Sequence, residues 1–385
     1  MALKFCAVMP ENVAGNDMDT LQLSLLLIAG GKSSRMGQDK RWVEYDGASM
    51  LEWLLRKAQR QAFARRYLCV EQATKELQVL AKQYEFELLV DEQAGMGPME
   101  GLRRGLSAMP TAYGLALSCD MPFFAFSALE PLLTELTSQT GVMAVQAETN
   151  GRRQPLAAIY HRELARNFAT ALAAGERKLG KVIDMVPHRL VAVPRVNCFF
   201  NANTPADMRL VRGRLANSWR DVPLVTVSAP VSNTGKTTFI ERLIPRLQEE
   251  GIRVGVVKGD CHGYQVDVEG KDSWRFSKAG ADAVAVVSPT GYFIQQRTEK
   301  RASLAAMASR LEQVDVVLIE SRNHGARPEV SLWRGLGEPM VREDTAALFV
   351  GGKVSESLSE QVHCYDIEDT AQAEKLVKFL MGKDF

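Results

Sequence analysis

The sequence predicts an α/β protein built from two doubly wound domains, in which helices cover both faces of a mainly parallel sheet. Short apolar runs alternate with helical or polar stretches along the chain, as such folds require. A glycine-containing turn follows the apolar run at 23–28, and another follows the run at 224–228. The first turn is typical of a Rossmann-like sheet and the second of a P-loop sheet.

Length and composition support this division. A chain of 385 residues is too long for one ordinary core and indicates about two or three domains. With 46% apolar and 24% charged residues we expect a soluble, cytoplasmic globular protein. The net charge of +1 favours neither a nucleic acid nor a membrane as partner. The six cysteines have no paired spacing, so we expect reduced thiols rather than disulfides or a zinc site.

The first domain is expected at residues 21–210. Residues 1–20 are interpreted as a flexible extension, because their pattern does not suit a signal peptide. Ser49 and Glu52 have capping-box spacing and predict a helix that buries Leu51, Leu54, Leu55 and Ala58. Further apolar runs predict strands at 67–70, 86–90, 115–118 and 142–145.

The second domain is expected at residues 222–385. The polar stretch at 211–221 carries no strand signal and is interpreted as a linker. After the strand at 224–228, apolar runs predict strands at 252–257, 283–287, 314–319 and 346–350, and an amphipathic helix at 371–381.

The first glycine turn, AGGKSSRMGQ at residues 29–38 with Asp39 and Lys40 after it, has the composition of a phosphate site. Gly30 and Gly31 leave backbone amides accessible, because no Cβ stands in the way. Arg35 and Lys40 bring positive charge to the same turn. The alternative is an ordinary strand-to-helix turn with solvated basic residues, but this run of basic residues favours phosphate binding.

Other polar residues should converge on this turn at the carboxyl edge of the sheet. Asp91 closes a strand and precedes the glycine-rich segment 95–101, which is flexible enough to wrap a base or ribose. Asp120 closes another strand and suits Mg²⁺ beside phosphates, although a helix-capping role explains its position equally well. By themselves, Asn201 and Asn203 are more often turn residues before a proline.

Five motifs occur in order between residues 23 and 208, namely LIAGGKSSRMGQDK, GPMEG, SCDMP, GRRQPLAAIY and FNANTPADM. Together they resemble the molybdenum cofactor guanylyltransferases (the MobA family), which transfer GMP from GTP to molybdopterin. The resemblance implies a nucleotidyltransferase sheet with catalytic roles for Arg35, Lys40 and Asp120. It implies GTP contacts at Ala29, Gly30, Gly31, Lys40, Asp91, Gly97, Pro98, Gly101 and Asp120, and molybdopterin-side positions at Asn201 and Asn203. Cytidylyl and sugar-phosphate transferases share the first motif and remain the alternative.

The chemistry that this resemblance implies needs no protein nucleophile. The terminal phosphate of molybdopterin is already anionic, attacks the α-phosphorus of GTP in line, and displaces pyrophosphate. Catalysis then consists of positioning and charge neutralisation, with Mg²⁺ on Asp120 and with Lys40 and Arg35 on the phosphates.

The second glycine turn, PVSNTGKT at residues 230–237, follows a strand and opens a helix expected at 238–248, as in a P-loop. Pro230 stands where the pattern has glycine, yet the amides from Asn233 onward remain. The predicted phosphate contacts are Asn233, Thr234, Gly235, Lys236, Thr237 and Thr238. The run DVVLIE ends at Glu320, which together with Thr237 suits a second Mg²⁺ or is, equally, a surface acid.

These strings, together with GKDS and KAGA further along, resemble the small GTP-binding adapter of molybdopterin guanine dinucleotide synthesis (the MobB family) over about residues 222–385. The chain therefore resembles a fusion of transferase and adapter. This resemblance implies GTP and molybdopterin as ligands, molybdenum cofactor insertion proteins and acceptor molybdoenzymes as partners, and a homodimer through the second domain. The segment 321–323 departs from the adapter pattern, so GTP hydrolysis and a non-catalytic docking module both remain open for this domain.

Overall fold

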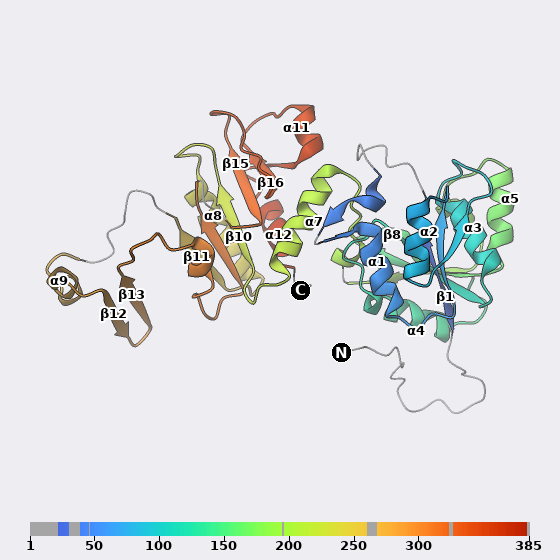
Figure 1. Ribbon diagram of the computed structural model, residues 1–385, viewed down its shortest axis with the longest axis horizontal. Coiled ribbons are helices and arrows are strands. Elements are labelled where there is room, and N and C mark those ends of the chain that lie inside the picture. The colour runs from blue at the N-terminus through green and yellow to red at the C-terminus, as the bar shows by residue number, and fades with distance from the viewer. Residues whose placement is uncertain are drawn as a thin grey trace, which may run out of the picture. The chain divides into compact units, whose positions relative to one another are not determined.

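The structure, a computed structural model, describes residues 22–30, 39–45, 47–194, 196–259, 268–322 and 326–382 (Figure 1). The contact pattern divides the chain between Met208 and Arg209 into two compact units. Each unit contains its own sheet with helices around it, which confirms the predicted fold class. The two units are described separately below.

The first unit is built on a seven-stranded sheet of order β5-β4-β1-β6-β8-β7-β9. β8 is antiparallel to both of its neighbours, whereas the other neighbouring strands are parallel. The predicted strands are confirmed as β1, β4, β5, β6 and β7, but β8 and β9 lie outside the predictions. The strands are β1 (Leu23–Ile28), β4 (Arg66–Val70), β5 (Glu87–Val90), β6 (Tyr113–Ser118), β7 (Ala144–Thr149), β8 (Arg152–His161) and β9 (His188–Ala192).

Helices cover both faces of this sheet. Leu25 and Leu27 of β1 belong to the core under α1, α2 and α4, whereas Leu26 and Ile28 belong to the core under α3, α5 and α6. A central parallel strand is buried on both faces, which explains its uninterrupted apolar run. The helices are α1 (Met50–Gln59), α2 (Lys75–Gln83), α3 (Pro98–Ala108), α4 (Glu130–Ser138), α5 (Leu164–Ala173) and α6 (Leu179–Ile183). The smaller elements are η1 (Lys40–Trp42), β2 (Glu44–Tyr45), β3 (Ala48–Ser49), η2 (Phe126–Leu129) and η3 (Val196–Phe199).

The capping-box prediction for α1 is confirmed. The Ser49 hydroxyl accepts a hydrogen bond from the Glu52 backbone N–H at 3.2 Å, which satisfies one of the free amides of the first turn. The buried stripe of this helix contains the four predicted residues and Met50.

The second unit is built on a six-stranded sheet of order β11-β14-β10-β15-β16-β17, in which all paired strands are parallel. α8 and α12 pack against one another, and ion pairs link them at Arg246 to Glu374 (2.9 Å) and Lys378 to Glu250 (2.7 Å). The strands are β10 (Leu224–Ser228), β11 (Val254–Lys258), β14 (Val316–Glu320), β15 (Glu329–Trp333), β16 (Thr345–Val350) and β17 (His363–Asp366). The helices are α8 (Lys236–Glu249), α10 (Leu304–Ala308), α11 (Glu356–Gln361) and α12 (Thr370–Leu380).

The strand predicted at 283–287 does not join this sheet. It is β12 (Ala283–Ser288), which pairs antiparallel with β13 (Gly291–Gln296) in a separate hairpin beside α9 (Asp272–Ala279) (Figure 1). Within β12 only Val284 is buried, so this strand lacks the two-sided burial of a parallel-sheet strand. Its apolar run predicts a strand but not its partner, because an apolar run is compatible with either arrangement.

Helix α7 (Pro205–Asn217) crosses the division between the units and contains most of the predicted linker. From Arg209 onward it belongs to the second unit, so the linker prediction for residues 211–217 is corrected to a helix. Val211 is fully buried there. Gly213 allows the close approach, because a Cβ at this position would lie 2.9 Å from Leu380 Cδ2 and 3.1 Å from Pro328 Cβ.

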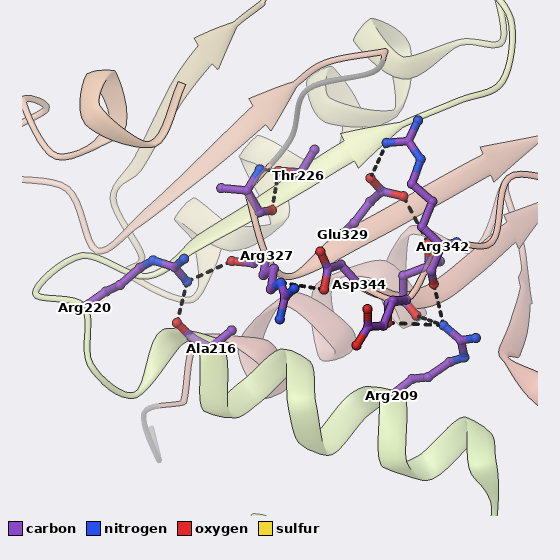
Figure 2. A network of polar contacts seen from close by, with 11 residues as sticks. Arg209, Ala216, Arg220, Thr226, Arg327, Glu329, Arg342 and Asp344 are labelled. Carbon is purple, nitrogen blue, oxygen red and sulfur yellow. Dashed lines mark hydrogen bonds and ion pairs between the residues drawn. The ribbon is translucent and has the colours of Figure 1, made fainter. Parts of the chain in front are cut away.

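Polar contacts fix this helix to the loops of the second sheet (Figure 2). The Arg209 guanidinium donates to the Arg342 carbonyl at 2.5 Å, and Arg220, just beyond the helix, donates to the Arg327 carbonyl at 2.8 Å. The acceptor loops are braced in turn by ion pairs from Arg327 to Asp344 (2.6 Å) and from Arg342 to Glu329 (3.3 Å). From Arg209 onward the helix is thus a structural part of the second unit.

Asn217 makes the most buried of these contacts. Its side chain is 2% exposed, donates to the carbonyls of Leu224 (3.0 Å) and Leu380 (2.8 Å), and accepts from the Leu224 N–H (3.0 Å). One side chain therefore ties the end of α7 to the start of β10 and to the end of α12.

None of the helices within the described ranges is long and apolar enough to cross a membrane.

We predict that Asn217→Ala lowers the free energy of unfolding of the second unit by about 2 kcal/mol, because several buried polar groups lose their partner at once. Urea titration of the full chain measures the change. Asn167→Ala, at an exposed position of α5, is the matched control and should leave the midpoint unchanged. Equal midpoints for the two variants would contradict the structural role of α7.

Candidate functional site

Three of the predicted site residues of the first unit lie together at the carboxyl edge of its sheet. The Lys40 ammonium lies 2.6 Å from Asp120 Oδ2 and 3.1 Å from Asn203 Oδ1. β1 and β6 are parallel neighbours with Ile28 opposite Ser118, so residues that follow their ends must meet at one edge. Parallel pairing thus brings together Lys40 and Asp120, which are 80 positions apart in the sequence.

Asp120 is held by hydrogen bonds on both sides. Ser118 donates from Oγ to Asp120 Oδ1 at 2.5 Å, and the Asp120 carbonyl accepts from the Ala202 N–H at 2.9 Å. The carboxylate is 9% exposed, so its remaining access faces the site and not bulk water. Ser118 is not among the predicted site residues, although its position two residues before the aspartate on the same strand is a usable signal.

The two asparagines have different roles. Asn203 accepts a hydrogen bond from Lys40, and its position on the molybdopterin side stays a prediction. Asn201 donates from Nδ2 to the Phe199 carbonyl at 3.0 Å, which is the local contact of a turn residue. The structure therefore places Asn203 among the charged groups of the site and gives Asn201 a turn contact.

Asp91 lies against the glycine turn. A Cβ on Gly30 would lie in ordinary contact with Asp91 Oδ2, at 3.8 Å, so the carboxyl group lies directly beside the backbone of this glycine. Burial, followed by the nearby charges of Glu100 and Glu71, raises the pKa of Asp91 to about 7. Asp91 Oδ1 is buried without a hydrogen-bond partner among the described residues. A ligand that donates hydrogen bonds would satisfy this atom.

The segment predicted as a flexible glycine loop is partly helical. Gly97 has φ of +72° and precedes α3, with Pro98 at the first turn. Gly101 is inside the helix and buried, and a Cβ there would lie 3.4 Å from Cys69 Cβ and 3.5 Å from Ile28 Cδ1. Gly101 therefore lies where the helix packs against two strands, and its nucleotide contact stays a prediction.

Glu100 braces the same segment from inside. It is 3% exposed, accepts from the Glu92 N–H at 3.1 Å, and forms an ion pair with Arg103 at 2.7 Å. These contacts lower the pKa of Glu100 although burial opposes ionisation. Glu100 thus acts on the site through the charge that it places near Asp91.

Lys57 holds the loop that follows Asp120. Its ammonium donates to the carbonyls of Pro122 (2.9 Å) and Phe124 (3.4 Å), and burial lowers its pKa. No spacing rule marks this lysine in the sequence, because its partners are backbone carbonyls. Cys119 beside Asp120 is buried, which raises the pKa of its thiol to about 12, so it is not a nucleophile at neutral pH.

Two predicted phosphate contacts of the first turn, Gly31 and Arg35, lie outside the described residues. Beyond this gap, the Asp39 carboxylate caps η1 through the Arg41 N–H at 3.1 Å. Arg41 pairs with the same carboxylate and donates to the Ala29 carbonyl at 3.2 Å. The two sides of the turn are therefore joined by a side-chain bridge.

The predicted P-loop of the second unit is confirmed as a strand, a turn and a helix. Asn233 has φ of +60° and Gly235 has φ of +96°, both in the left-handed region, where consecutive amides can form an anion-binding concavity. The helix begins at Lys236, two residues earlier than predicted, and burial lowers the pKa of this lysine. Thr234 is buried, with its hydroxyl on the Val231 carbonyl (2.8 Å), whereas Thr238 is exposed.

Thr237 and Glu320 meet across the P-loop. The hydroxyl of Thr237 lies 3.0 and 3.1 Å from the two carboxylate oxygens of Glu320. β10 and β14 are parallel neighbours with Val227 opposite Glu320, so the predicted pair follows from strand register.

Both sites suit Mg²⁺ by the chemistry of their oxygens. Mg²⁺ in nucleotide sites is bound by one or two carboxylates, with phosphate oxygens and water as further ligands. Asp120 in the first unit, and Glu320 with Thr237 in the second, supply such oxygens. The described residues contain no cluster of three or more His, Cys, Asp or Glu that would hold a metal by themselves, and a phosphate-dependent magnesium site needs none.

Comparison with known proteins divides the chain in the same way. The family model described as "MobA-like NTP transferase domain" matches residues 25–191, and the one described as "Molybdopterin guanine dinucleotide synthesis protein B" matches residues 224–350. A molybdopterin-guanine dinucleotide biosynthesis adapter protein of Haemophilus influenzae is 38% identical over 132 residues, which are 34% of this chain and 74% of the relative.

The first part of the chain is similar to a different set of proteins, the molybdenum cofactor guanylyltransferases. A probable molybdenum cofactor guanylyltransferase of Pyrococcus horikoshii is 26% identical over 197 residues, which are 50% of this chain and 100% of the relative. The crystal structure of molybdopterin-guanine dinucleotide biosynthesis protein A from Archaeoglobus fulgidus is 25% identical, covers 49% of this chain and 95% of its own, and has a TM-score of 0.43.

We predict that the ionisation of Asp91 destabilises the first unit as the pH rises. A carboxyl group whose folded pKa is raised binds its proton more tightly in the folded state, so stability is lost between the unfolded value near 3.8 and the folded value of about 7. The melting temperature of the wild type should therefore fall relative to that of Asp91→Asn between about pH 4 and about pH 7. Glu87→Gln, at an exposed position of β5, is the control, and parallel curves for all three proteins would refute the assignment.

Proposed function

Because the chain belongs, over its second unit, to the family of molybdopterin-guanine dinucleotide biosynthesis adapter proteins and carries a MobA-like NTP transferase domain in its first, we propose that it transfers GMP from GTP to molybdopterin. The chain combines a nucleotidyltransferase domain with an adapter domain. In the proposed reaction the adapter unit binds a second GTP. The observation that carries the proposal is the convergence of Lys40, Asp120 and Asn203 beside the glycine turn.

The proposed reaction forms one bond and breaks one bond at phosphorus. An anionic phosphate oxygen of molybdopterin bonds to the α-phosphorus of GTP, and the bond to the bridging oxygen breaks, so that pyrophosphate leaves with its electron pair. Lys40 offsets charge on the phosphates, and Asn203 orients the Lys40 ammonium through its amide oxygen. The buried Cys119 thiol plays no nucleophilic part.

Asp120 would hold Mg²⁺ in the first site, and Thr237 with Glu320 would hold it in the second. When bound, the ion neutralises negative charge on phosphate oxygens. Ser118 keeps Asp120 oriented, and Lys57 keeps the following loop in place. These residues supply the positioning that such a transfer requires.

Asp91 is proposed to accept hydrogen bonds from the base or ribose of GTP. Its unpartnered Oδ1 and its place beside Gly30 support this role. Donors from a nucleotide favour the ionised carboxylate, so GTP binding would lower the raised pKa of Asp91.

The partners proposed for the second unit are molybdenum cofactor insertion proteins, acceptor molybdoenzymes and a second copy of the chain. The outer face of the β12–β13 hairpin supports the last of these. Val287, Tyr292 and Ile294 are 80%, 65% and 64% exposed, and β-pairing places Val287 opposite Tyr292 on the same face. A two-stranded hairpin is only marginally stable by itself. Burial of its apolar face against a second copy of the chain would stabilise it.

We predict that Asp120→Ala abolishes GMP transfer, with a loss of at least about a hundredfold, because the phosphates lose both the carboxylate that would hold Mg²⁺ and the partner of Lys40. The assay incubates the purified chain with molybdopterin, Mg²⁺ and GTP and measures pyrophosphate. Asp184→Ala is the control. Near-normal turnover by Asp120→Ala would refute the assignment, and faster turnover with CTP would make the protein a cytidylyltransferase.

A separate prediction concerns the hairpin. Val287→Asp should convert a dimer of the full chain into a monomer in size-exclusion chromatography with light scattering, because the charge would be buried without a partner. Val79→Asp, at a 62% exposed position of α2, is the matched control and should leave the dimer intact. A wild-type monomer at micromolar concentration would contradict the proposed homodimer.

A further inference from the structure

Arg334 lies directly beside the P-loop, although no sequence motif marks it. It follows the last residue of β15, the parallel neighbour of β10, so it emerges at the same edge of the sheet as the P-loop. Its Nε donates to the Thr234 carbonyl at 3.1 Å. A Cβ on Gly235 would lie 3.7 Å from the same Nε, which shows how closely the guanidinium approaches the loop backbone.

The guanidinium of Arg334 is held in this place from behind. Its Nη2 donates to Glu368 Oε1 at 2.8 Å, and Glu368 also forms an ion pair with Arg242 of α8. The hydrogen bonds from Arg334 and then Arg242 lower the pKa of Glu368. The aliphatic part of the Arg334 side chain lies against Gly351, where a Cβ would lie 3.2 Å from Arg334 Cγ. Glycine at that position makes room for the arginine.

The contact with Thr234 fixes the orientation of one peptide plane. The carbonyl of Thr234 and the N–H of Gly235 belong to the same planar unit and point in opposite directions. An arginine that binds the carbonyl from outside therefore keeps the N–H directed away from itself. Asn233 and Gly235 both have positive φ and shape the anion-binding turn. The Thr234–Gly235 peptide is part of this turn.

We propose that Arg334 is a positioning residue of the P-loop: anchored by Glu368, it holds the Thr234–Gly235 peptide in the orientation that presents the Gly235 amide to bound phosphate. The proposal rests on the proposed binding of GTP by the second unit. An exposed ion pair between Arg334 and Glu368 would contribute little by itself. The hydrogen bond to the loop carbonyl is what gives Arg334 an effect on the ligand.

The test measures GTP binding to the full-length protein by calorimetry with Mg²⁺ present. The wild type should bind two equivalents, and Lys236→Ala should retain only the equivalent of the first unit, which identifies the signal of the P-loop. Arg334→Gln should weaken that P-loop equivalent about tenfold, because one charge-assisted hydrogen bond is lost, and leave the first equivalent unchanged. Glu368→Gln should weaken it less, since only the anchor is lost.

Two further measurements separate this role from a general loss of structure. Arg253→Gln removes an arginine from another ion pair, with Asp315, and should leave both affinities unchanged. Guanidinium ion at low millimolar concentration should restore part of the affinity of Arg334→Ala, which a misfolded loop would not allow. If Lys236→Ala binds as many equivalents as the wild type, GTP binding by the second unit is refuted. If Lys236→Ala loses one equivalent but Arg334→Gln binds GTP as tightly as the wild type, or if guanidinium does not rescue Arg334→Ala, the positioning role is refuted.

Discussion

Parallel strand pairing is the constraint on which both sites depend. β1 lies next to β6 in the first unit and β10 next to β14 in the second, so the residues that follow these strands share one edge. The partner strands supply carboxylates at this edge, and in the second unit the positive-φ residues Asn233 and Gly235 shape a turn whose amides can form an anion-binding concavity. Binding of phosphate together with a divalent ion needs both kinds of group within a few ångströms of each other. The parallel order of the strands brings the residues that follow them to one edge, whichever side chains they carry. Ligand sites in such sheets generally lie at the carboxyl ends of the strands.

The sequence predicts the inner strands, the first helix cap and the acid that partners each turn. These elements have strong local signals: an uninterrupted apolar run, a Ser and Glu at fixed spacing, or a carboxylate at a strand end. It does not predict β8, β9, β15 or β17, nor the separation of β12 into a hairpin. Gly101 and Arg334 show why. The first is a glycine whose neighbours come from other strands, and the second acts on a backbone carbonyl 100 residues away, so neither role has a local pattern.

Helix α7 shows how polar sequence can conceal a structural role. The sequence of this helix lacks the apolar periodicity that predicts an amphipathic helix. Its arginines and Asn217 instead donate hydrogen bonds to backbone carbonyls. A buried asparagine whose polar groups are all satisfied helps to specify the packing around it, yet in the sequence it looks like a surface residue. The helix also begins just after Asn203, which contacts Lys40. One short segment of chain therefore supplies a residue of the first site and a structural element of the second unit.

The pairing of Lys40 with Asp120 has a consequence for how the first site handles charge. The two side chains are 20% and 9% exposed, and an unpaired charge at such a position would be costly. In the free protein each neutralises the other. In the proposed reaction, a nucleotide with its divalent ion would bring one group of each sign, so the ammonium would exchange the carboxylate for phosphate while the carboxylate would exchange the ammonium for the cation. Each charged side chain would then have a partner of opposite sign before and after binding. Asp91 differs in this respect, because its neighbours Glu71 and Glu100 are acidic and its raised pKa leaves it poised to ionise when a donor arrives. The site thus combines a charge pair that exchanges partners with a carboxyl group that gains one.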